Sequence, residues 1–111
     1  MVDMDRLRVL AIGVALAAGP RVALAAGQGD AAKGKAVFQQ CSVCHRADSE
    51  QKKMGPGLKG LFKKAKLTNG RKPTDAGVRA KIDAGGNGMP AYKDMLSDAE
   101  KDDLMAYLKT L

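Results

Sequence analysis

Cys41-Ser42-Val43-Cys44-His45 is the stretch of this chain that decides its fold. Two thiols separated by two residues and followed at once by an imidazole form the pattern C-x-x-C-H, the attachment sequence for a c-type haem. This spacing lets both sulfurs reach the two vinyl-derived carbons of one porphyrin and places the next side chain beneath the iron. We therefore expect one haem c, bound covalently through Cys41 and Cys44, with His45 as an axial ligand of the iron.

Three other uses of a cysteine pair fit this chain less well. A redox dithiol is typical of a βαβ setting and does not need the histidine that follows the second cysteine. A structural zinc site needs four ligands, whereas the chain has only two Cys and one His. A disulfide across two residues would stabilise little, because the stabilisation from loop closure grows with the length of the loop.

The sixth position of the iron cannot be filled by a second histidine, because His45 is the only one. Another residue type, water or no ligand at all could occupy it, and methionine is the leading candidate, since a His/Met pair raises the reduction potential. Met54 lies nine residues after His45, and Met95 and Met105 lie in or beside the last expected helix. Met89 lies 44 residues after His45 in a non-helical stretch, so we expect its sulfur on the iron, although Met is more often a gap-filler in a core.

The rest of the chain is typical of short helices joined by loops, with no alternating strand pattern. Three segments begin with capping residues: Asp30 before residues 31–39, Thr74 or Asp75 before a helix that ends at Gly85-Gly86, and Ser97 with Glu100 before the last helix. Residues 46–73 contain glycines and prolines that break any long helix, so we expect a loop with one helical turn. These elements predict an all-α domain.

The first 25 residues have the pattern of a targeting segment that is removed from the mature protein. Arg6 and Arg8 precede an apolar stretch, and Ala23-Leu24-Ala25 is an A-x-A cleavage signature, so we expect residues 1–25 to be a cleaved signal peptide. The apolar stretch is far shorter than the roughly 20 residues of a membrane-spanning helix. Residues 26–111 would form the working domain, and with only two Phe, two Tyr and no Trp in the chain we expect a bound group to fill part of its core.

Together these features resemble a small bacterial class I cytochrome c, from about Gly29 to Leu111. The resemblance rests on the order and spacing of five segments: Gly34-Lys35-Ala36-Val37-Phe38, the CSVCH site, Gly55-Pro56-Gly57-Leu58, Met89-Pro90-Ala91-Tyr92 and Leu104-Met105-Ala106-Tyr107-Leu108. It implies a cytochrome c fold, with three to four short helices around one covalently bound haem c. It also implies a soluble single-haem electron carrier.

The resemblance implies roles for individual residues as well. The carbonyl of Pro56 would accept a hydrogen bond from the His45 ring nitrogen that does not bind iron. The first and last helices would cross in close contact, with Gly34 and Phe38 against Tyr107 and Leu108. Apolar side chains would wall the haem, namely Leu58, Leu61, Phe62, Val78 and Ile82.

The charge distribution indicates a class of partner. Residues 26–111 hold 16 basic and 10 acidic residues, a net charge of +6, with the basic residues concentrated in 46–82 and acidic ones in the last segment. We expect a dipolar molecule that docks on redox proteins with an acidic surface, although ordinary solubility charge would look the same. A nucleic-acid partner is not expected, because aromatic residues are not interleaved with the basic ones.

We further expect a periplasmic monomer without stable membrane insertion and without enzymatic activity. The main alternative is a haem enzyme or gas-binding protein with an open distal site. Met89 argues against that alternative, and carbon monoxide binding to the reduced protein would distinguish the two.

Overall fold

The computed structural model describes residues 29–111, in which three α-helices and one 3-10 helix are joined by loops. The elements are α1 (Ala31–Phe38), the 3-10 helix η2 (Leu61–Lys63), α2 (Asp75–Ala84) and α3 (Asp98–Leu108). The all-α prediction is confirmed for this part of the chain. The expected signal peptide, residues 1–25, lies outside the described residues.

Each α-helix begins at the capping residue expected from the sequence. Asp30 accepts hydrogen bonds from two backbone N–H groups of α1, and Thr74 accepts one from Gly77 in α2. Ser97 and Glu100 form a reciprocal capping box at α3, with both hydrogen bonds at 3.1 Å. These side chains satisfy N–H groups that have no partner inside the helix, which is why the helices start where they do.

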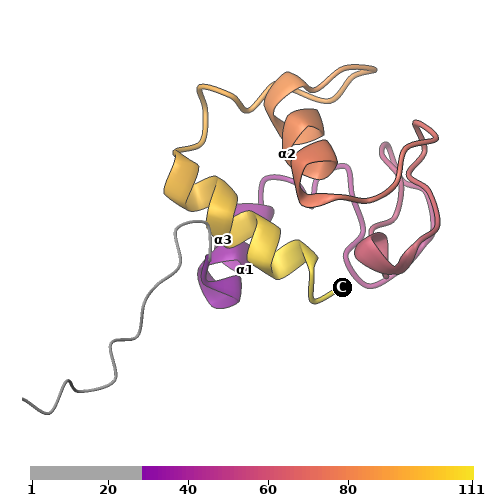
Figure 1. Ribbon diagram of the computed structural model, residues 1–111, viewed down its shortest axis with the longest axis horizontal. Helices are drawn as coiled ribbons and strands as arrows, with labels where there is room; N and C mark the ends of the chain where they lie inside the picture. Colours follow the sequence, from indigo (N-terminus) through magenta and orange to yellow (C-terminus); the bar gives the residue numbers. More distant parts are fainter. Residues whose placement is uncertain (1–28) are drawn as a thin grey trace, which may run out of the picture.

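Helices α1 and α3 cross in close contact, and α2 lies beside this pair (Figure 1). The contact depends on Gly34, because a Cβ atom there would lie 2.5 Å from the carbonyl carbon of Asp103 and 2.8 Å from the Cβ of Tyr107. One turn further along α1, the ring of Phe38 packs against that of Tyr107 with 5.3 Å between centroids. The crossing implied by the family resemblance is therefore present.

The buried apolar core is small and is drawn from all the helices. Leu104 is its most buried large side chain, at 1% exposure. Its other members are Phe38, Leu61, Val78, Ile82, Tyr92, Leu96, Met105 and Leu108. Leu58 and Phe62 are only partly buried and pack at its margin. A core of this size stabilises a domain weakly, as the composition indicates.

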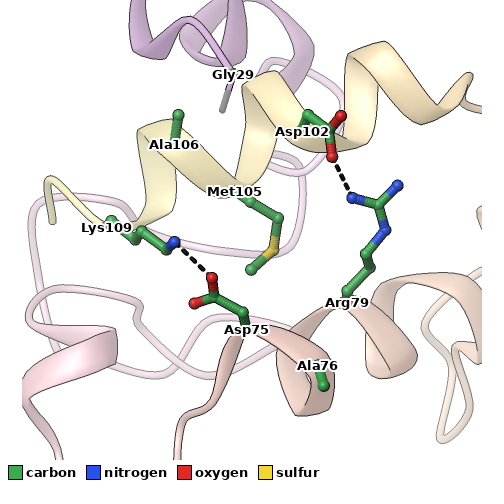
Figure 2. A pocket seen from close by; sticks show the side chains of 8 residues that line it. All are labelled: Gly29, Asp75, Ala76, Arg79, Asp102, Met105, Ala106 and Lys109. Atoms are coloured by element: carbon green, nitrogen blue, oxygen red, sulfur yellow. Dashed lines mark hydrogen bonds and ion pairs between the residues drawn. The ribbon is translucent and has the colours of Figure 1, made fainter. Parts of the chain in front are cut away.

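Ion pairs connect α2 with α3. They are Arg79 with Asp98 (3.3 Å) and Asp102, Lys101 with Asp83 (2.8 Å), and Lys109 with Asp75 (2.6 Å). Figure 2 shows two of them flanking Met105, at a hollow of about 430 Å³ between the helices. Arg79 of the basic middle is thereby paired with two acidic residues of the last segment.

Candidate haem site

The C-x-x-C-H motif forms a tight turn that continues directly from α1. The N–H of Cys41 donates to the carbonyl of Phe38 at 2.8 Å, and the N–H groups of Cys44 and His45 donate to the carbonyl of Cys41 at 3.1 and 2.9 Å. In this helix-like turn, residues three and four apart share a side, so the two thiols and the imidazole are held close together. Both cysteines are free thiols and are half-buried.

His45 is oriented by the loop that follows the motif. Its Nδ1 lies 2.8 Å from the carbonyl oxygen of Pro56. A carbonyl can only accept, so Nδ1 carries the proton and Nε2 is left with a free lone pair, which is the form that binds a metal. The hydrogen bond implied by the resemblance is thus present, and it leaves Nε2 to serve as the ligand.

Gly55 allows this loop to lie against the imidazole. A Cβ at this position would be 2.5 Å from Cε1 and 2.8 Å from Nδ1 of His45, so any side chain would displace the ring. The N–H of Gly55 also donates to the carbonyl of Cys44 at 2.8 Å, which ties the loop to the motif. Gly55 belongs to one of the segments that carry the family resemblance, but its contact with His45 was not predicted.

The four methionines of the described residues differ in their environment. Met54 and Met95 are 77% and 62% exposed, and Met105 is buried in α3 within the core. Met89 is half-buried and packs at the margin of the core, as Cys41 does. Met89 is thus the partly buried methionine outside the helices among residues 29–111, which is compatible with the predicted role as a ligand.

The chain reaches Met89 through a two-residue hairpin turn. The backbone N–H and carbonyl groups of Gly86 and Met89 pair at 2.9 and 3.1 Å, and the intervening Asn87 and Gly88 have φ values of 53° and 89°. Positive φ at both central residues is the type I′ turn, for which Asn-Gly is the preferred sequence. This stretch is non-helical, as expected, but the tight turn was not predicted, although the Asn87-Gly88 pair is a signal for it.

Tyr92, three residues after Met89, is a buried member of the core. Tyr92 is 7% exposed. Burial raises the pKa of its hydroxyl, and the nearby Cys41 and Cys44 raise this pKa further. Burial likewise raises the pKa of the Cys41 thiol, and the charge of Cys44 adds to the effect. Met89 and Cys41 both pack against the apolar core to which Tyr92 belongs.

These residues fit a c-type haem. The thiols, the oriented imidazole and a half-buried thioether are the donors that such a group requires, and Leu58 and Phe62 supply partly buried apolar surface at the margin of the core. Pro56 is half-buried, and its carbonyl oxygen faces Nδ1 of His45. A metal site made by the protein alone is not supported, because no three His, Cys, Asp or Glu side chains within residues 29–111 are grouped closely enough to hold an ion.

None of the helices in residues 29–111 has both the length and the apolar character needed to span a bilayer.

Comparisons of this chain with known proteins agree on one family. The sequence model of the Cytochrome c family matches residues 31–111. A cytochrome c2 of Agrobacterium tumefaciens (strain II Chrys) is 35% identical over 79 residues, which cover 67% of this chain and 68% of that protein. A cytochrome c2 of Rhodopseudomonas palustris is 59% identical over 32 residues, or 29% of this chain, so the similar segment spans only 26% of that relative's length.

A solved structure shows the same fold. Cytochrome c6 from the diatom Phaeodactylum tricornutum superposes with a TM-score of 0.57 at 29% identity, covering 74% of this chain and 93% of that one.

Proposed function

Because this chain belongs to the cytochrome c family, we propose that it is a soluble single-haem electron carrier that passes one electron at a time between redox partners outside the cytoplasm. The proposal rests mainly on the orientation of His45. Its Nδ1 is hydrogen-bonded to the Pro56 carbonyl, which leaves Nε2 available for iron. When bound, the haem supplies the reversible one-electron couple. The protein's task is to hold it in a fixed, apolar environment.

Each residue of the site has a part in that task. Cys41 and Cys44 would anchor the haem covalently, directly after α1. His45 would bind iron through Nε2, and the carbonyl of Pro56 would fix the ring plane and raise the basicity of the ligand. Met89 would occupy the opposite position, where its thioether favours ferrous iron and keeps the potential high.

The surface beside the motif suits brief contacts with an acidic partner. Val43 is 63% exposed and Met54 is 77% exposed, which gives two apolar side chains next to the attachment turn. The exposed basic residues Arg46, Lys52 and Lys53 lie close to them in the sequence. A small apolar centre with a basic rim favours electrostatically steered, weak encounters. Export rests on the signal-peptide pattern of residues 1–25.

The test replaces Met89 in the haem-loaded protein. The oxidised wild type should show the weak long-wavelength charge-transfer band of a thioether–iron bond. Met89→Ala should lose this band, bind carbon monoxide when reduced and show a lower potential, while the haem stays covalently attached. Met95→Ala is the matched control, because Met95 follows Met89 closely in sequence but is 62% exposed.

Two results would contradict the proposal. If Met95→Ala or Met54→Ala loses the band instead, Met89 is not the ligand. If the wild type lacks the band and binds carbon monoxide readily, the site is open and the protein is not a simple carrier.

A further inference from the structure

Lys101 is the one buried charged side chain among residues 29–111, at 5% exposure. It lies on α3, and its Nζ donates to the backbone carbonyl of Lys93 at 2.9 Å and contacts Oδ1 of Asp83 at 2.8 Å. Burying an ammonium group is unfavourable unless it is paired and hydrogen-bonded. Its position therefore depends on both of these partners.

The two partners lie at the two ends of the loop that carries Met89. Asp83 is in the last turn of α2, and Lys93 lies four residues after Met89. Here we name residues 84–93 the Met89 segment. The two ends of this segment, which we call its base, lie side by side, because Tyr92 N–H donates to the Ile82 carbonyl at 2.9 Å and Lys93 N–H donates to the Asp83 carbonyl at 3.3 Å. Lys101 thus binds the chain where it leaves α2 and where it returns toward α3.

Asp83 depends on Lys101 to an unusual degree. Its Oδ1 is inaccessible to solvent and has no well-aligned hydrogen bond, so the ammonium at 2.8 Å is its compensation as an ion pair. Removing the Lys101 charge would leave that oxygen buried and uncompensated and would leave the Lys93 carbonyl without its side-chain donor. Both losses act on the base of the Met89 segment.

The other ion pairs between α2 and α3 have no such connection. Arg79 joins Asp102 and Lys109 joins Asp75, as Figure 2 shows, and Arg79 also joins Asp98. All of these residues lie outside the Met89 segment. Their basic side chains are also more exposed, at 31% and 46%. These two basic residues connect α2 with α3 alone, whereas Lys101 connects α3 with both ends of the Met89 segment.

Helix α3 is also tied to the attachment motif. It packs against α1 at the Gly34 crossing, and α1 runs directly into the turn that holds Cys41. A side chain that binds the Met89 segment to α3 therefore also fixes the position of this segment relative to α1 and to the turn that carries the thiols and His45. We propose that Lys101 is a positioning residue for Met89, which keeps the sulfur in place as the axial ligand; this rests on the proposed function.

The test compares Lys101→Met with Arg79→Met in the haem-loaded protein. Both changes remove a basic group that pairs α3 with α2, but only the first affects the Met89 segment. Two quantities are measured: amide hydrogen exchange at Tyr92 and Lys93, and the affinity of the oxidised protein for added imidazole. Each should rise about tenfold or more in Lys101→Met, the size expected for losing a charge-assisted hydrogen bond. In Arg79→Met each should stay within about twofold of the wild type, since weakly buried pairs contribute little.

The control decides between positioning and general stability. Equal effects of the two variants, or no effect of Lys101→Met on either quantity, would overturn the proposal. If Lys101→Met does not fold, Asp83→Asn replaces it, because this change keeps the bond to the Lys93 carbonyl and should give smaller changes of the same sign. If Met89→Ala leaves the charge-transfer band intact, the ligand assignment fails, and amide exchange alone then decides whether Lys101 holds the segment.

Discussion

Replacing Gly34 with alanine should destabilise the protein, although alanine is the better helix former. Gly34 lies inside α1 at its crossing with α3, where a Cβ atom would lie 2.5 Å from the Asp103 carbonyl carbon and 2.8 Å from the Cβ of Tyr107. Carbon atoms pack best at about 3.5 Å or more, so the helices would have to separate by about 1 Å. Neither contact is with the end of a flexible side chain that can turn away.

The two opposing effects can be compared. Exchange of glycine for alanine within a helix favours folding by about 1 kcal/mol. Overpacking in a core costs about 1 to 3 kcal/mol, and contact with backbone on the facing helix places this site near about 3 kcal/mol. The net loss is then about 2 kcal/mol. For a domain of this size, that lowers the melting temperature by about 8 to 16 °C.

The measurement is thermal unfolding of the haem-loaded protein, followed by far-ultraviolet circular dichroism. Ala36→Gly is the control, because Ala36 lies on the exposed side of the same helix, and this change should cost about 1 kcal/mol from helix propensity alone. A Gly34→Ala protein that melts at or above the wild-type temperature would refute the close-contact argument. It would mean that the crossing has room for a methyl group.

Three further changes test other parts of the structure. The double variant Cys41→Ala, Cys44→Ala should give little folded protein, because the small core needs the bound haem, and a cooperative helical melt without haem would contradict this. Gly85→Ala should cost more than Gly70→Ala in denaturant unfolding, by about 1 to 2 kcal/mol: both glycines have positive φ, but a Cβ at Gly85 meets the Met89 and Pro90 backbone while Gly70 has open space around it. Equal losses would mean that Gly85 has no role in closing the loop. Electron transfer to an acidic partner should slow as salt is raised, because the Debye length is only about 8 Å at physiological ionic strength, and stopped-flow rates independent of salt would leave the basic residues with a solubility role.

Much of the fold was predictable because it depends on short-range chemistry. Asp30 and Ser97 cap helices by reaching N–H groups two or three residues away, so their effect is contained in the local sequence. The same holds for the attachment motif, whose spacing is set by the two bonds that it makes to one porphyrin. The Asn87-Gly88 turn was equally local, and it was overlooked rather than unpredictable.

The hydrogen bond between His45 and Pro56 was expected only from the family resemblance. The two residues are eleven positions apart, and nothing in their identities requires them to meet. The contact of Gly55 with the imidazole ring was not expected at all, because a glycine in a loop indicates a turn as readily as it indicates a close approach.

By itself, then, the sequence determined the helix starts and the attachment chemistry, and it predicts Met89 as the ligand among the available methionines. Tertiary structure alone decided which charges are paired and which are buried. Lys101 lies among acidic residues in the sequence, yet it is buried because α3 places it against Asp83 and the Lys93 carbonyl. Burial and pairing depend on which surfaces meet after the chain has folded, and that is a long-range property that local pattern does not contain.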